Sequence, residues 1–172
     1  LDGAGATLSN GNLDATIAGG NVTNHAVGTI AVRSGKYYWE IQTTQSTTTG
    51  IIGVANLDVP VTERGWASPS FLGVWGVYQG TGSIWNNGSQ TPYSSFYPQD
   101  TVVGVALDMD AKTLTFYYDG VSQGIAFFPE MTGLIAPWVG NGSATYPHTY
   151  VANFGQREFV GAIPDGYKAL CT

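Results

Sequence analysis

An alternating aromatic strand at residues 34–41 is the feature that most limits how this chain can fold. After a Ser-Gly turn, Tyr37, Trp39 and Ile41 point to one face of an extended backbone, while Glu40 lies on the other. Such alternation is typical of a strand in a sheet that has one buried face. The sequence therefore predicts a strand here, with Trp39 in the core.

Strand signals recur along the chain, and no long stretch carries apolar residues at helical spacing. The expected strands cover residues 6–10, 12–17, 27–32, 36–43, 50–55, 71–78, 83–86, 101–108, 113–119, 123–127, 134–139, 149–154 and 167–170. Many short strands at near-regular spacing predict an all-β antiparallel sandwich or barrel. A length of 172 residues suits a single domain spanning residues 1–172.

Asn-Gly and Asp-Gly pairs separate several of these strands. They are Asn10-Gly11, Asn87-Gly88, Asp119-Gly120 and Asn141-Gly142. Both residue types tolerate the positive φ that tight hairpin turns require, so each pair predicts a turn. Residues 101–108 are apolar at almost every position, which predicts a strand covered on both faces.

Low charge excludes some classes of partner. The chain has six Lys plus Arg against twelve Asp plus Glu, and its charged content is 10%, where about 25% is usual. No basic patch for nucleic acid or for an anionic membrane surface is expected. Apolar runs are too short for membrane insertion. The polar, charge-poor composition is common on extracellular and virion proteins, and the single cysteine, Cys171, forms no internal disulfide.

No arrangement of side chains in the sequence predicts catalysis or a metal site. Asp108 and Asp110 have the spacing of a calcium-loop start, but further ligands are missing and a hairpin turn is favoured. No strand carries the same-face carboxylate pair of a sandwich glycosidase. His25, His148 and Cys171 form no convincing nucleophile or zinc set. We therefore expect no catalytic residue, no metal and no cofactor.

The aromatic residues divide into two groups. Those in expected strands, which we expect in the core, are Trp39, Phe116, Phe127, Trp138 and Phe154. Those in or beside loops are Trp66, Tyr93, Phe96, Tyr97, Tyr146 and Tyr150. Exposed Tyr and Trp side chains are typical anchors of binding surfaces. The alternative is that each closes a small core under its own loop.

Several segments in order resemble the SPRY domain family. After the tryptophan strand come an apolar strand at residues 50–55, the hairpins of residues 103–127 with Asp119-Gly120 where the family usually has Asn-Gly, and residues 135–139 and 151–155. The resemblance spans nearly the whole chain. It implies a bent antiparallel two-sheet β-sandwich, a concanavalin-like jelly roll, that binds partners through loops at one end and does not catalyse.

The two ends of the chain resemble SPRY modules of phage and prophage tail or fibre proteins. The similarity lies in residues 6–13 and 164–172, and the latter usually run on into another domain. The resemblance implies a domain excised from a larger virion protein, located on a virion or outside the cell. Its neighbours would be other domains of that protein.

The function expected from the resemblance is recognition of a host surface glycan or protein. The long irregular stretches at residues 58–70 and 86–99, with the turn at 141–148, would supply the site. The expected ligand-binding residues are Glu63, Arg64, Trp66, Tyr93, Tyr97, Tyr146 and His148. The alternatives are a lectin-fold enzyme that degrades a polysaccharide and a structural assembly domain of the virion.

Overall fold

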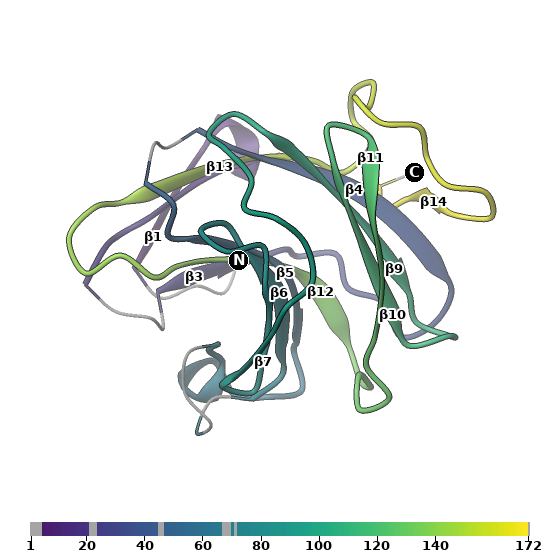
Figure 1. Ribbon diagram of the computed structural model, residues 1–172, viewed down its shortest axis with the longest axis horizontal. Helices are drawn as coiled ribbons and strands as arrows, with labels where there is room; N and C mark the ends of the chain where they lie inside the picture. The colour runs from purple at the N-terminus through teal and green to yellow at the C-terminus, as the bar shows by residue number, and fades with distance from the viewer. Residues whose placement is uncertain (1–4, 21–23, 45–46, 67–69, 71, 172) are drawn as a thin grey trace.

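Two β-sheets face each other in the computed structural model, which describes residues 5–20, 24–44, 47–66, 70 and 72–171 (Figure 1). The larger, sheet A, has the strand order β1-β2-β13-β4-β9-β10-β11, and β14 also pairs with β4. Its strands are β1 (Ala6–Ser9), β2 (Asp14–Ile17), β4 (Lys36–Thr43), β9 (Val102–Asp108), β10 (Thr113–Tyr118), β11 (Val121–Phe127), β13 (His148–Asn153) and β14 (Lys168–Ala169).

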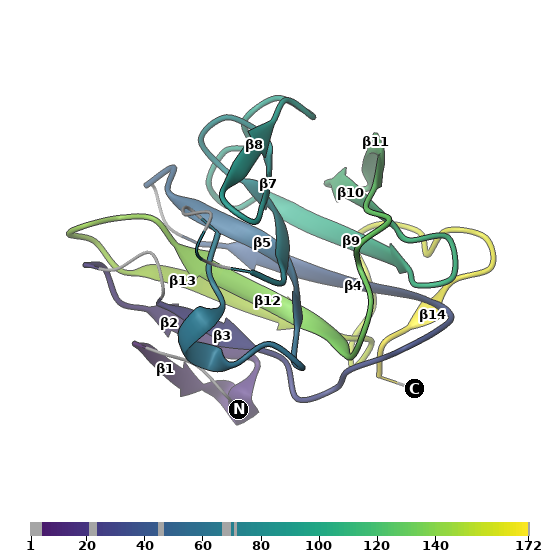
Figure 2. The same cartoon turned by 90° about the horizontal axis from the view of Figure 1, so that it is seen from below.

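The smaller sheet, sheet B, has the order β3-β12-β5-β6-β7-β8. Its strands are β3 (His25–Val27), β5 (Gly50–Asn56), β6 (Val74–Tyr78), β7 (Ile84–Asn86), β8 (Ser89–Thr91) and β12 (Ile135–Asn141). Two short 3-10 turns, η1 (Asn10–Asn12) and η2 (Val61–Glu63), are the helical segments of the described chain. Neighbouring strands are antiparallel apart from the β4–β14 pair. The predicted all-β sandwich is therefore confirmed (Figure 2).

The main core lies between the sheets and is built from the inward faces of alternating strands. Trp39 pairs with Val105 across β4 and β9, and both side chains are fully buried. Phe116 on β10 and Ile52 on β5 complete the same cluster from either sheet. The alternation read from residues 34–41 thus predicted the correct face of β4.

The outer face of sheet A is covered by the chain that follows β13. Glu40, which is 3% exposed, accepts hydrogen bonds from Val160 N at 3.0 Å and Gly161 N at 2.7 Å. The ring of Phe159 packs edge-on against Tyr38 at 5.1 Å. This segment, yellow in Figure 1, lies beside β4 and β14. It explains why β9 is buried on both faces, as residues 101–108 predicted.

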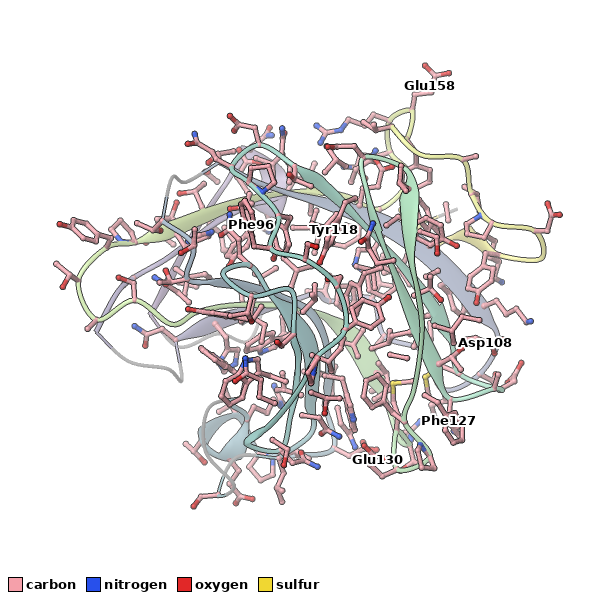
Figure 3. All side chains as sticks on the ribbon, in the orientation of Figure 1. Phe96, Asp108, Tyr118, Phe127, Glu130 and Glu158 are labelled. Carbon is pink, nitrogen blue, oxygen red and sulfur yellow. The ribbon has the colours of Figure 1, made fainter. Side chains whose placement is uncertain are left out.

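Some expectations were wrong in detail. Residues 27–32 are not a continuous strand, because the chain leaves sheet B after Val27 and returns only at an isolated bridge between Val32 and Ile135. Phe127 is not in the core: it is 63% exposed on β11, the last strand of sheet A, where nothing in the described chain covers it (Figure 3).

The turn pairs are confirmed with one exception. Positive φ occurs at both residues of Asn10-Gly11, Asn87-Gly88 and Asp119-Gly120. At the fourth pair, neither Asn141 nor Gly142 has positive φ, and Asn141 instead ends β12 as a buried side chain.

We predict that Trp39→Ala lowers the free energy of unfolding by about 3–5 kcal/mol, because it leaves a cavity between the sheets. Urea denaturation followed by circular dichroism measures this loss. The matched control is Phe127→Ala, which removes an exposed aromatic ring from the same sheet and should change stability by less than about 0.5 kcal/mol. A loss below about 1 kcal/mol for Trp39→Ala would contradict the core assignment.

Candidate functional site

Three connections meet at one end of the sandwich, on the left of Figures 1 and 2. They join β2 to β3, β4 to β5 and β12 to β13, and their described residues are 18–20, 24, 44, 47–49 and 142–147. We call this surface the loop end. The backbone of Gly20 donates to Ser143 O at 2.9 Å, and Gly142 N donates to Thr49 O at 2.9 Å. The three connections are thus bonded to one another through their own backbones.

Asn141 is the hub beneath the loop end. Its fully buried amide nitrogen donates to Tyr146 O at 2.8 Å and to Ile17 O at 3.2 Å. Its amide oxygen accepts from Ser143 N at 2.9 Å and from the hydroxyl of Thr49 at 3.2 Å. One side chain therefore ties all three connections together. Sequence analysis missed this role because an Asn-Gly pair predicts a tight turn.

His148 forms a second support under the loop end. Its Nε2 lies 2.6 Å from Thr43 Oγ1, and its Nδ1 lies 3.2 Å from Thr47 Oγ1. The ring also packs on Tyr150, with 4.9 Å between ring centroids. Burial lowers the pKa of His148 to about 4, so the imidazole is neutral at physiological pH.

The outer surface of the loop end is uncharged and carries one large aromatic ring. Tyr146 is 61% exposed, and exposed Thr48 and Thr145 add hydroxyl groups. Its described residues include no Asp, Glu, Lys or Arg. Such a surface recognises a partner by hydrogen bonds and ring contacts, without an electrostatic contribution from its own side chains.

The prediction that the loop aromatics lie outside the packed core is wrong for Trp66 and Tyr97. Trp66 is 5% exposed, stacks on Tyr78 at 5.3 Å and meets Trp85 edge-on at 5.1 Å. It belongs to a second apolar cluster on the outer face of sheet B, next to Gly142 of the loop end. Tyr97 is 1% exposed and joins the main core.

Tyr93 bonds to β10 and β11 at an irregularity of sheet A. The register of β10 against β11 shifts between Thr115 and Tyr117. The Tyr93 hydroxyl fills this break, since it accepts from Phe116 N at 3.1 Å and donates to the carbonyl oxygen of Gly124. Burial raises the pKa of Tyr93, which keeps the hydroxyl protonated for that bond.

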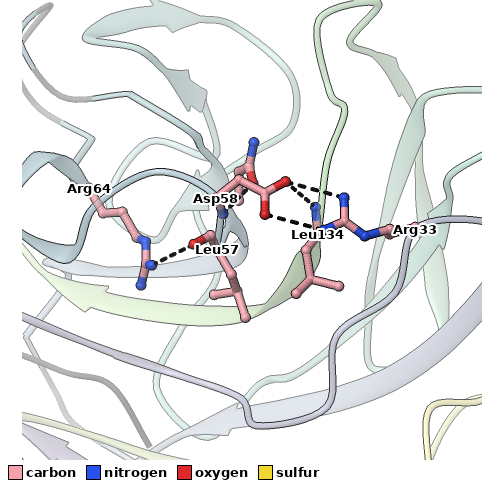
Figure 4. A network of polar contacts seen from close by, with 6 residues as sticks. Arg33, Leu57, Asp58, Arg64 and Leu134 are labelled. Carbon is pink, nitrogen blue, oxygen red and sulfur yellow. Dashed lines mark hydrogen bonds and ion pairs between the residues drawn. The ribbon is translucent and has the colours of Figure 1, made fainter.

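The charged members of the expected site lie in the segment that crosses the outer face of sheet B. Arg64 is 4% exposed and donates to Val59 O at 2.7 Å and to Leu57 O at 3.1 Å. Nearby, Arg33 pairs with Asp58 at 3.3 Å (Figure 4). Glu63 is exposed in η2. Of the seven expected residues, then, only Glu63 and Tyr146 are exposed, and only Tyr146 lies at the loop end.

Asp108 and Asp110, the pair with the spacing of a calcium-loop start, lie at a hairpin turn between β9 and β10. Asp108 pairs with Lys36 at 2.9 Å, and its other oxygen accepts from Asp110 N and Ala111 N, which confirms the hairpin-turn interpretation. In the described residues no group of three or more His, Cys, Asp or Glu side chains could hold a metal ion. No helix within the described ranges has the length and apolar character to span a membrane.

We predict that Asn141→Asp destabilises the protein by about 1–3 kcal/mol or more, because a carboxylate oxygen would face the carbonyls of Ile17 and Tyr146 in place of a donor. Urea denaturation measures the change. Asn87→Asp is the matched control, since the Asn87 amide oxygen accepts from Gly73 N and Asp keeps that acceptor. Equal losses in the two variants would contradict the hub role.

We predict that His148 makes the protein less stable as pH falls from 6.5 towards 4. Its pKa is lower in the folded state than the ordinary 6.5, so the unfolded chain binds the proton more tightly and folding loses free energy in this range. The full loss is on the order of 3 kcal/mol. Melting temperatures across this range, compared with His148→Gln, isolate the effect. Parallel pH profiles for the two proteins would contradict it.

Comparison with known proteins identifies the family of this chain. A family model described as the SPRY domain matches residues 36–157. SPRY domain-containing SOCS box protein 3 of Xenopus tropicalis is 30% identical over 114 residues, which cover 59% of this chain and 31% of that protein. The human SPRY domain-containing SOCS box protein 1 is 31% identical over 115 residues, covering 58% and 41%. The chain therefore spans less than half the length of these relatives.

The crystal structure of the SPRY domain of human HERC1 has a similar fold. Its TM-score is 0.76 at 22% sequence identity, and the match covers 89% of this chain and 94% of that domain. At this identity the likeness supports the two-sheet sandwich alone.

Proposed function

Since this chain belongs to the SPRY domain family, we propose that it is a non-catalytic module that binds a protein partner through its loop end. SPRY domains are protein-interaction modules. We choose the loop end because the Asn141 hub ties three connections into one hydrogen-bonded platform that exposes the ring of Tyr146. A platform held from below loses little entropy when a partner binds.

The chemistry of the loop end defines the kind of partner. Exposed Thr48 and Thr145 share the loop end with Tyr146, and the described residues of this surface carry no charge. The partner is therefore a neutral, polar segment of a protein, whose backbone amides meet the hydroxyls and whose apolar side chain packs on the tyrosine ring.

Burial of His148 argues against catalysis at this surface. His25 and His148 are the first residues of β3 and β13, which flank the connections, and both are fully buried. The ring nitrogens of His148 face the hydroxyls of Thr43 and Thr47. A histidine that serves as a general base must reach the proton that it removes. The imidazole here is fully buried.

A glycan is the second candidate ligand. The observation that favours it is a tyrosine ring exposed among hydroxyl side chains, since a flat ring packs on the face of a sugar. The placement in a phage tail or fibre protein, on a virion or outside the cell, stays a prediction, because it depends on residues 6–13 and 164–172 alone. The polysaccharide-degrading enzyme and the assembly domain stay alternatives.

Substitution of Tyr146, the exposed ring of the loop end, tests whether this surface binds the partner. Binders are selected from a displayed peptide library, and a glycan array is probed in parallel. Tyr146→Ala should weaken peptide binding by about 30-fold, equivalent to about 2 kcal/mol, and leave the melting temperature unchanged. Phe127→Ala, an exposed aromatic on β11, is the control and should bind like the parent protein.

The opposite pattern would overturn the proposal. Peptides that bind Tyr146→Ala normally and lose affinity for Phe127→Ala would move the site to β11. Saturable binding on the glycan array, with no peptide selected, would favour the second candidate.

A further inference from the structure

A cavity of about 320 Å³ opens between the two sheets, away from the residues proposed to bind a protein partner. Its walls come from β1, β2, β4 and β13 of sheet A and from β3 and β12 of sheet B. Strands β1, β2 and β3 lie together at the lower left of Figure 2. We propose that this cavity binds a small uncharged molecule with an apolar body and one hydrogen-bonding group. This inference does not depend on the proposed function.

Small side chains create the space. Ala15, Ala26 and Ala152 line the cavity from three strands on inward-facing positions. Elsewhere the same interior is filled by residues as large as Trp39 and Trp75. Protein interiors are normally packed as densely as organic crystals, and an empty cavity of this size destabilises a fold. A bound molecule would restore those contacts.

The cavity has an apolar floor. Ala15, Ala26, Ile41 and Val139 line it, and each is 9% exposed or less. Tyr150 also lines the cavity, and its hydroxyl already donates to Gly140 O and accepts from Ile51 N. The side chains of Ala15, Ala26, Ile41 and Val139 therefore offer a ligand no polar group. The apolar end of a ligand would point inwards.

The mouth is uncharged and carries polar side chains beside the exposed apolar side chain of Ile30. Its exposed lining residues include Asn12, Thr29, Gln156 and Cys171, which carry amide, hydroxyl and thiol groups. None of the described lining residues is Asp, Glu, Lys, Arg or His. A charged ligand would lose its hydration here without gaining a partner of opposite charge. A neutral ligand with a hydroxyl, amide or carbonyl group matches both parts of the cavity.

Volume limits the size of the ligand. A cavity of about 150 Å³ holds one benzene molecule. The present cavity is about twice as large, and it falls at the lower end of the roughly 300–1,000 Å³ range of small-molecule sites. A body of two fused rings, or a medium-length aliphatic chain, is the matching size. Prodan, a neutral naphthalene dye with one ketone, has this size and chemistry and changes its emission in apolar surroundings.

Titration with prodan tests the proposal. We expect saturable binding with a blue-shifted emission, displaced by 1-decanol and at least tenfold less well by decanoate. Ala26→Leu and Ala152→Leu, which add bulk to the cavity lining, should each weaken prodan binding by at least tenfold while the melting temperature stays the same or rises. Phe127→Ser, which removes an exposed apolar ring on β11, is the control for surface adsorption and should bind prodan normally.

Cys171 gives a second readout that needs no substitution. It is the single cysteine of the chain, it is exposed, and it lines the cavity. Saturating 1-decanol should slow its reaction with a neutral maleimide several-fold, and decanoate at the same concentration should not. Prodan binding that survives both leucine substitutions, or that disappears in Phe127→Ser, would overturn the proposal, as would an unchanged maleimide rate. Loss of peptide binding by Tyr146→Ala has no bearing on these outcomes.

Discussion

Tyr150 joins the two sheets, and the rest of the structure is arranged around that link. The residue belongs to β13 of sheet A, and its hydroxyl donates to Gly140 O and accepts from Ile51 N at 3.1 Å, both in sheet B. Burial raises the pKa of the hydroxyl, so it remains a donor. The link holds the sheets at one separation. The Tyr150 ring packs against His148, which supports the loop end, and Tyr150 also lines the cavity.

Rigid support and an uncharged surface are the two properties that this frame gives to the loop end. Asn141 and His148 hold the connections by buried hydrogen bonds, whose loss would leave unsatisfied polar groups in the interior. The exposed side chains are then free for contact with a partner. Recognition of this kind depends on shape and hydrogen bonding, and it should vary little with ionic strength.

The division of the aromatic residues into buried and exposed does not follow the division into strand and loop residues that the sequence predicted. Trp66 lies in a long connection, yet it covers the outer face of sheet B, and Tyr93 completes a break in sheet A. Phe127 lies in a strand and is exposed. An aromatic ring buried in a core and an exposed ring that can bind a partner have the same chemistry. Only the presence or absence of covering chain distinguishes them, and that chain is distant in sequence.

Most of the strands, most of the turns and the family could be predicted from the sequence, because period-two alternation and positive φ are properties of neighbouring residues. It placed Trp39 on the correct face for that reason. Tertiary structure alone decided the hub, the exposure of Tyr146 and the cavity. Asn141 bonds to Ile17 across 124 positions, and the alanines of the cavity come from strands that pair only after folding. Such contacts depend on how two sheets are stacked, and no local pattern of residues encodes that spacing.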